Sequence, residues 1–287
     1  MDRSLIQAVM MLVFGNNVAI LSDSLIKMLG SYDAPFQFAL MRQISGLIVL
    51  IPVMLLMKKS LRPREMRWHM VRSHVWFISS LFMVISLTTL PLATANAVFY
   101  AAPLLTVFLA VLFFGEKASG LAIVTSVLGL IGVLVIVNPG EANGFVVAAL
   151  VVALALAVNN LLIKKLPAHH GVIETLYFTN LLALPVGIAG TLIEGSAWSW
   201  DMALLAFGSS IFILIYAATC VFAYRAAQSN IVSSAEYTGL IGAVVVGMIV
   251  FAEQPELRFY IGAALIVVPL ILMTVMQKQP ARAEIEA

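Results

Sequence analysis

Residues 92–117 read LATANAVFYAAPLLTVFLAVLFFGEK, and a degenerate copy, SNIVSSAEYTGLIGAVVVGMIVFAEQ, begins at Ser229. The two stretches align without a gap at an offset of 137 residues, so that Tyr100 falls on Tyr237 and Glu116 on Glu253. The loops and the lengths of the neighbouring apolar segments match as well. Similarity at a fixed period indicates an internal duplication. We therefore predict that the chain consists of two related halves.

The composition predicts an integral membrane protein. Hydrophobic residues make up 62% of the 287 positions, charged residues make up 10%, and the mean hydropathy is +1.05. A helix needs about 20 mostly apolar residues to cross the hydrocarbon core of a bilayer. The connections leave no room for a separate soluble domain. Ten spanning segments can be drawn, at about 4–27, 35–57, 73–91, 93–115, 119–137, 144–164, 172–193, 202–224, 231–252 and 258–276.

Lysine and arginine predict the orientation of these segments. Cytoplasmic loops are enriched in basic residues. With the N-terminus inside, thirteen of the sixteen basic residues lie on the cytoplasmic side. We therefore expect both termini in the cytoplasm and a multi-pass location in a bacterial-type inner membrane. The thirteen are Arg3, Lys58, Lys59, Arg62, Arg64, Arg67, Arg72, Lys117, Lys164, Lys165, Arg225, Lys278 and Arg282.

Each copy contains five predicted helices, and this odd number determines how the halves are related. After five crossings the second copy enters the membrane from the opposite side, which gives an inverted repeat. The predicted fold is an all-α integral membrane protein with ten transmembrane helices in a five-plus-five inverted repeat. Residues 1–142 form the first repeat, residues 143–278 the second, and residues 279–287 a cytoplasmic tail.

Several motifs resemble the EamA-type members of the drug/metabolite transporter superfamily. They are ATANAVFYAAPLLTVFLAVLFFGEK with the following GLIGVLVI, then SDSLIKMLGSYDAPFQFALMR, and FAEQ with IGAALIVVP in the second half. The resemblance spans essentially the whole chain. It implies a ten-helix inverted repeat whose central cavity is lined mainly by helices 1, 3, 4, 6, 8 and 9. It also implies secondary transport of small metabolites, often export of amino acids and in some relatives uptake of riboflavin or S-adenosylmethionine.

The second copy departs from this pattern at one position. Pro103 predicts a kink in the segment 93–115, because proline removes a backbone donor and clashes with the preceding turn. The second copy has Leu240 at the equivalent position. A matching kink is therefore not predicted for the segment 231–252.

Charged groups inside the bilayer are costly, so each one suggests a function or a partner. Glu236 stands where the first copy has Phe99, and this is the sharpest break in the internal symmetry. Its carboxyl could exchange a proton for substrate, or it could be a hydrogen-bonded structural group. Arg42 could bind a substrate carboxylate or phosphate. It could also form an ion pair with Asp23, and the ion pair is the favoured interpretation.

Uncharged polar and aromatic residues complete the predicted substrate cavity. Amide and hydroxyl side chains in these helices could line a cavity or could form hydrogen bonds between helices. Adjacent asparagines point about 100° apart on a helix, so we expect at most one of each pair to face the cavity. Glu116 and Glu253 close equivalent helices and are predicted to have a structural role, such as capping neighbouring helices. The predicted cavity residues, besides Glu236, are Asn16, Asn17, Trp76, Asn96, Tyr100, Asn160, Tyr216 and Tyr237.

Other functional classes find less support. A membrane enzyme acting on a lipid would need a cluster of catalytic or metal-binding groups, and a channel would favour rings of charge; neither pattern occurs. The four histidines, His69, His74, His169 and His170, are expected to be solvated rather than metal ligands. We predict no catalytic residues, metal, cofactor or nucleic-acid partner.

The predicted function is secondary transport of a small organic solute across the bilayer, with coupling to protons through Glu236. The solute is either an amino acid or related zwitterionic or aromatic compound that is exported, or a vitamin or nucleoside-like cofactor that is taken up. The chain could act as a monomer or as a homodimer.

Overall fold

The computed structural model describes residues 3–30, 34–60, 65–115, 119–138, 144–226, 232, 235–236 and 238–276. These ranges contain helices and connecting turns and no β-strand. The α-helices are α1 (Arg3–Lys27), α2 (Pro35–Leu56), α3 (Arg67–Leu87), α4 (Leu92–Phe99), α5 (Ala101–Phe114), α6 (Gly120–Val137), α7 (Gly144–Leu162), α8 (Val172–Glu194), α9 (Trp200–Ala226), α11 (Thr238–Phe251) and α12 (Leu257–Met276), and α7 continues into the 3-10 turn Ile163–Lys165.

The helices have the length and surface of membrane spans. Within the described ranges, seven helical segments are long and apolar enough to cross a bilayer, and three shorter apolar helices accompany them. Large apolar side chains lie on the outside of the bundle, including Leu56 at 83% exposure and Ile193 at 88%. Such a surface is unfavourable in water and suits lipid, where every backbone group must also be satisfied within its helix. The chain is therefore a multi-pass membrane protein.

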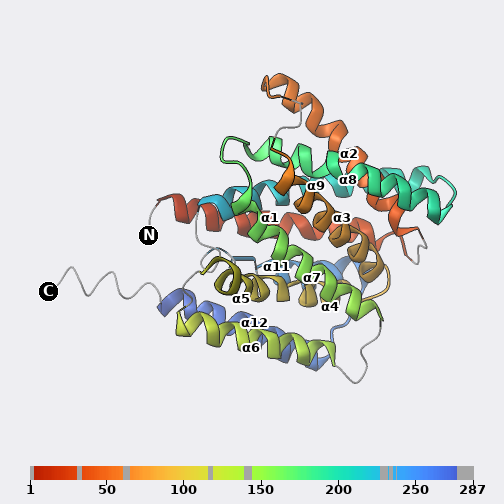
Figure 1. Ribbon diagram of the computed structural model, residues 1–287. Helices are drawn as coiled ribbons and strands as arrows, with labels where there is room; N and C mark the ends of the chain where they lie inside the picture. The colour runs from red at the N-terminus through yellow and green to blue at the C-terminus, as the bar shows by residue number, and fades with distance from the viewer. Residues whose placement is uncertain are drawn as a thin grey trace.

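The helices pack in three groups (Figure 1). The pair α2 and α8 lies at one edge of the molecule, and the pair α6 and α12 lies at the other. Between them α1 packs on α9, and α3 packs on α7. At the α6–α12 contact, a Cβ atom on Gly132 would lie 2.5 Å from the carbonyl oxygen of Gly262, and the reverse distance is the same. The two backbones can approach this closely only because both residues are glycines.

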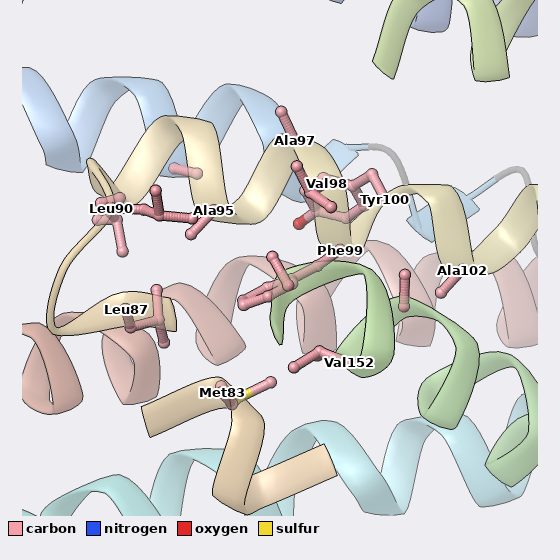
Figure 2. Close-up of a cluster of buried hydrophobic side chains, with 14 of the residues drawn as sticks. Met83, Leu87, Leu90, Ala95, Ala97, Val98, Phe99, Tyr100, Ala102 and Val152 are labelled. Atoms are coloured by element: carbon pink, nitrogen blue, oxygen red, sulfur yellow. The ribbon is translucent and has the colours of Figure 1, made fainter. Parts of the chain in front are cut away.

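The predicted helix 93–115 is interrupted. Helix α4 ends at Phe99 and α5 begins at Ala101, with Tyr100 between them (Figure 2). The two helices together form one candidate membrane span, Leu92–Phe113, and the predicted kink lies at the break between them. The reason is Pro103, which has no amide hydrogen to donate and whose ring clashes with the carbonyl of Phe99, four residues earlier.

The second copy is also interrupted at the equivalent place. Ala235 and Glu236 lie in a 3-10 turn, and α11 begins at Thr238. A helix running from residue 231 was predicted. The second copy has Leu240 in place of Pro103, so its interruption does not depend on a proline at this position.

Two glutamates cap the first turns of other helices. The Glu253 carboxylate accepts hydrogen bonds from the backbone N–H of Leu92 (2.7 Å) and of Ala93 (3.3 Å) at the start of α4. The Lys27 Nζ lies 3.2 Å from Glu253 Oε1. Glu194 in the same way accepts from the N–H of Phe36 and Gln37 at the start of α2. The first amides of a helix lack partners within it and carry partial positive charge, which a carboxylate satisfies.

Candidate functional site

A small cavity lies at the centre of the bundle, beside the two helix interruptions. Its volume is about 40 Å³, which is room for a few water molecules but not for a metabolite. Helices α1, α3, α4, α5, α7 and α9 contribute to its wall, together with the turn that precedes α11. These segments correspond to the six helices that the family resemblance implies. The lining residues are Asn16, Ala19, Asp23, Met83, Asn96, Phe99, Tyr100, Ala102, Leu156, Ile213, Tyr216 and Glu236.

Glu236 is held in this cavity by two neutral donors. Its side chain is buried, at 3% exposure. The Tyr224 hydroxyl of α9 donates to Glu236 Oε1 at 2.6 Å, and the Asn160 amide of α7 donates to the same oxygen at 3.1 Å. Hydrogen bonds to a carboxylate are short and strong. Neither partner carries a positive charge.

Asp23 brings a second carboxyl group to the same cavity. It lies on α1 at 3% exposure and faces the side chain of Asn96. Its Oδ1 atom has no hydrogen-bond partner among the described residues. Tyr100 lies within electrostatic range of both Asp23 and Glu236. The described residues that line the cavity include no lysine, arginine or histidine.

Tyr100 is fixed by a close contact with α11. A Cβ atom on Gly239 would lie 2.0 Å from the Tyr100 hydroxyl and 3.1 Å from Asn16 Cβ. A side chain at this position would occupy the space of the tyrosine hydroxyl. Gly239 therefore permits α11 to pack against the helix interruption.

The remaining predicted residues lie at different distances from the cavity. Asn16 lines it, whereas the more exposed Asn17 donates to the carbonyl of Val13 at 2.8 Å and does not. Asn160 reaches it through Glu236. Trp76 lies in a separate chamber, described next. Tyr237 and Glu116 fall outside the described residues.

A second polar chamber lies between α2, α3, α8 and α9. Its volume is about 10 Å³, and both Arg42 and Arg72 line it. Arg72 is one of the basic residues predicted on the cytoplasmic side, but its side chain is buried at 1% exposure. Its Nη1 donates to Thr179 Oγ1 at 2.6 Å. The described lining residues are Arg42, Gln43, Arg72, Trp76, Leu176, Thr179, Asn180, Ser210, Ile213, Leu214 and Ala217.

Arg42 does not reach Asp23 directly. The two charges are close enough to interact electrostatically. However, no nitrogen of the Arg42 guanidinium lies within 4.0 Å of an Asp23 carboxyl oxygen. The Nη1 of Arg42 has no hydrogen-bond partner among the described residues.

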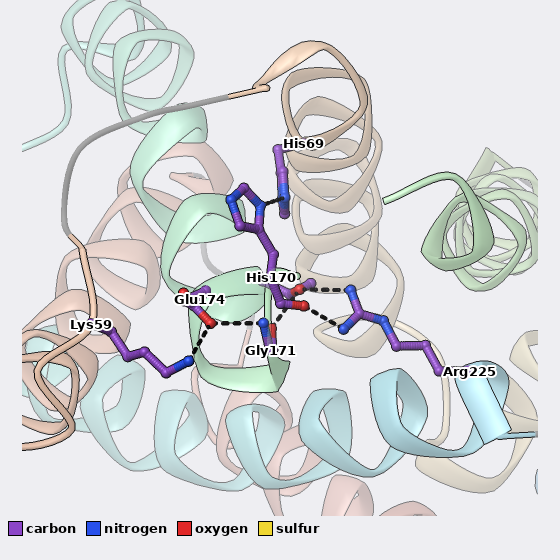
Figure 3. Close-up of polar contacts among 7 residues, drawn as sticks. Lys59, His69, His170, Gly171, Glu174 and Arg225 are labelled. Atoms are coloured by element: carbon purple, nitrogen blue, oxygen red, sulfur yellow. Dashed lines mark hydrogen bonds and ion pairs between the residues drawn. The ribbon is translucent and has the colours of Figure 1, made fainter. Parts of the chain in front are cut away.

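The expectation that the histidines are solvated is wrong for two of them. His69 is 0% exposed and His170 is 6% exposed, and their ring nitrogens lie 2.9 Å apart (Figure 3). Burial lowers the pKa of His170 from its ordinary value, and the positive potential of the nearby His169 lowers it further. The pairing joins the start of α3 to the loop before α8, so no spacing within one helix could have revealed it.

Charged groups surround this histidine pair and tie the same end of the bundle together. Lys59 Nζ lies 3.2 Å from Glu174 Oε2, which also accepts from the backbone N–H of Gly171 at 2.7 Å. The Arg225 guanidinium donates to the backbone carbonyl of His170. Figure 3 shows these contacts linking four separate segments. Within the described residues, no group of three or more histidine, cysteine or acidic side chains could hold a metal ion.

Comparison with known proteins finds similarity to membrane transporters. Residues 8–138 match the model of the EamA-like transporter family. An S-adenosylmethionine uptake transporter of Rickettsia conorii is 26% identical over 91% of this chain and 89% of its own. A riboflavin transporter of Vibrio cholerae is 25% identical over 86% and 85%. A pseudopaline exporter of Pseudomonas aeruginosa is 25% identical over 64% and 66%.

A solved crystal structure shares the fold. It superposes with a TM-score of 0.66 at 19% identity, over 94% of this chain and 98% of the other. The first half of this chain thus matches the EamA-like transporter family, within the drug/metabolite transporter superfamily, and curated transporters resemble the chain across both halves.

Proposed function

We propose that this protein is a secondary active transporter that moves a small organic solute by alternating access, with protons as the coupling ion. The solute carries a cationic group, such as the ammonium of an amino acid or the sulfonium of S-adenosylmethionine. The central cavity is its binding site in an occluded form. Export in exchange for a proton is the direction that this mechanism favours.

One observation carries the proposal: two buried carboxyl groups, Asp23 and Glu236, share a cavity whose described lining includes no basic residue. An isolated buried carboxylate is strongly disfavoured, so each group needs a proton or a bound cation. A cationic solute that binds at Glu236 can therefore displace the proton. When the solute leaves on the other side, a proton must return. This competition couples the two movements.

The packing of the helices supports an inverted repeat and hence alternating access. Helices α5 (Ala101–Phe114) and α11 (Thr238–Phe251) begin and end at equivalent positions of the two copies. The contact of α1 with α9 has a counterpart in that of α3 with α7, and α2 with α9 has one in α3 with α8. The start of α1 and the end of α12 lie on the same side (Figure 1). We propose ten helices, with residues 1–142 and 143–278 as the two repeats.

A second candidate is uptake of a nucleoside-like cofactor or vitamin. The relatives that align over most of this chain carry the names of S-adenosylmethionine and riboflavin transporters. S-adenosylmethionine is zwitterionic and carries two cationic groups, so it also suits a cavity with two carboxyls. This candidate differs from the first in the direction of transport and in the driving force. Transport measurements distinguish the two candidates.

The test is transport in proteoliposomes with and without an imposed pH gradient. The solutes are amino acids, S-adenosylmethionine and riboflavin. We expect a pH gradient to stimulate movement of at least one cationic solute by wild-type protein. In Glu236→Gln this stimulation is lost, because an amide cannot release a proton, while slow exchange of solute across the membrane remains.

Glu256→Gln serves as the matched control, because the Glu256 side chain is 67% exposed. It should keep the full response to the gradient. Gradient-driven transport by Glu236→Gln at the wild-type rate would contradict proton coupling through this residue. If the wild-type protein moves no solute but converts a lipid, the transporter interpretation itself is wrong.

A further inference from the structure

The chamber that contains Arg42 and Arg72, here called the arginine chamber, has two buried positive charges, and the acidic group that interacts electrostatically with Arg42, Asp23, lies outside its lining. Both side chains are buried, at 4% and 1% exposure. None of the described residues that line the chamber is acidic. A buried charge in a membrane protein is retained only where a partner of opposite sign offsets the cost of desolvation. In the described structure these two guanidinium groups have no such partner in contact.

Several polar atoms in the arginine chamber also lack hydrogen-bond partners. Among the described lining residues, Arg42 Nη1 and Arg72 Nε are buried donors without an acceptor, and Gln43 Oε1 is a buried acceptor without a donor. A buried donor left unpaired costs about 1 to 3 kcal/mol, so native proteins rarely tolerate several in one place. Guanidinium groups present their N–H donors in a fork that matches the two oxygens of a carboxylate or phosphate. The two unpaired guanidinium donors therefore favour an oxyanion as the ligand of this chamber.

The arginine chamber adjoins the central cavity. Ile213 of α9 lines both spaces. Asp23 and Glu236 line the central cavity, and Arg42 and Arg72 line the arginine chamber. An acidic space next to a basic one matches a solute that has a cationic group at one end and an anionic group at the other.

We infer that the arginine chamber is an anion-binding subsite that takes the carboxylate of the transported solute, while the cationic end of the same solute occupies the central cavity. This inference rests on the proposed transport function and adds the substrate class: a zwitterion. The chamber now has room for about one water molecule, so the carboxylate enters as the two spaces join. Trp76, whose ring lies 5.9 Å from the Arg72 guanidinium, forms part of its wall.

Matched solutes test the subsite in proteoliposomes. One pair is S-adenosylmethionine and its decarboxylated form, and the other is phenylalanine and phenylalaninamide. We expect wild-type protein to transport the carboxylate member of at least one pair. Arg42→Gln and Arg72→Gln should lower the kcat/KM for the solute with the carboxylate by about tenfold or more, which corresponds to about 1.4 kcal/mol. The same variants should change the kcat/KM for the solute without the carboxylate by less than about twofold.

Two further variants control for charge and folding. Arg67→Gln makes the same change at an exposed position of α3, the helix that also carries Arg72. This variant should transport both members of each pair like wild type. Arg42→Lys keeps the positive charge and should retain more of the preference for the carboxylate than Arg42→Gln does. Equal losses for both members of a pair would show that the arginines act only on folding, and would overturn the inference.

A binding measurement distinguishes a solute carboxylate from a free anion. The melting temperature (Tm) of purified protein in detergent is measured with sodium acetate or inorganic phosphate at constant ionic strength. We expect acetate to raise the Tm of wild type and Arg67→Gln but not that of Arg42→Gln. If acetate stabilises the protein but the variants treat both members of each pair alike, the chamber holds a free anion and the inference is wrong. If neither anion raises the Tm of wild type, the anion site itself is rejected, even when no tested solute is transported.

Discussion

At the scale of single residues, the central cavity concentrates groups that a membrane interior disfavours. Asp23 and Glu236 are both buried at 3% exposure, and the donors around Glu236 are a tyrosine and an asparagine. A charged side chain at this depth costs at least about 2.5 to 3.5 kcal/mol. Selection keeps such groups only where they act. In the proposed mechanism both carboxyls carry either a proton or a cationic solute, so neither is left as an isolated buried charge.

The contact between Tyr100 and Gly239 gives a prediction at this scale. In Gly239→Ala the new methyl group would meet the tyrosine hydroxyl at 2.0 Å, so the tyrosine or α11 must move. Overpacking of this kind costs about 1 to 3 kcal/mol. We expect transport to fall about tenfold or more. Removing the hydroxyl in the double variant Tyr100→Phe with Gly239→Ala should restore part of the activity.

Gly120→Ala is the control, because nothing lies within 4 Å of the position that its Cβ would take. It should transport like wild type. If Gly239→Ala is equally active, or if the double variant is less active than the single one, the Tyr100 contact does not limit this site.

The buried histidine pair predicts a dependence of stability on pH. The pKa of His170 in the folded protein is below its ordinary value of 6.5. As the pH falls below 6.5, the unfolded chain therefore binds protons that the folded protein does not, and the free energy of unfolding decreases. We expect the Tm in detergent to drop on acidification below pH 6.5. The drop should be smaller in His170→Asn and unchanged in His74→Asn; an identical drop in all three proteins would exclude His170 as its source.

Residues that are chemically unusual for a membrane helix could be predicted from the sequence, whereas residues buried only by the packing of one helix on another could not. Glu236 stood out because its repeat counterpart is Phe99, and the structure places it at the central cavity. Arg72 had the spacing of an ordinary loop arginine. Only the packing of α3 against α8 buries it beside Thr179, and this contact joins residues 107 positions apart.

At the scale of elements, the helix ends and interruptions surround the site. The break at Tyr100 was predictable as a kink, because a proline has a local steric effect. The later start of α11 could not be predicted, because no residue type in the second copy indicates a break there. The ends of α4 and α2 are each satisfied by a glutamate from the other half of the chain. Each cap therefore joins the two copies as well as two helices.

The cap on α4 gives a prediction at this scale. In Glu253→Gln the first turn of α4 loses its negative partner, and Lys27 loses an ion pair whose side chains are only 16% and 12% exposed. We expect the free energy of unfolding to decrease by about 1 to 2 kcal/mol, measured as a lower Tm in detergent. Glu256→Gln, at an exposed position three residues later, should leave the Tm unchanged. A Tm equal to wild type in Glu253→Gln would mean that water replaces this cap at no cost.

At the scale of the whole molecule, the apolar segments and the basic residues predict a membrane bundle and its orientation. The segments were predictable because each one must cover the thickness of the bilayer by itself. The packing of one segment against another could not be predicted, because all of the segments are apolar on nearly every face. Contacts such as Gly132 with Gly262 are decided by shape.

The orientation can be tested with introduced cysteines. The single native cysteine, Cys220, is buried, so the wild-type background should not react with a bulky thiol reagent. We expect a membrane-impermeant maleimide to label Ala197→Cys in intact cells and Lys58→Cys only after the membrane is permeabilised. Both positions are exposed. The reverse pattern would place the termini outside.

The small volume of the central cavity has a consequence for water. A space of about 40 Å³ holds a few water molecules, whereas the open forms that admit a metabolite must fill with many more. Each opening therefore draws in solvent from one side of the membrane. Osmotic stress from a solute too large to enter should favour the closed form and slow the cycle. Water is in this sense a second, unspecific ligand of the proposed cycle.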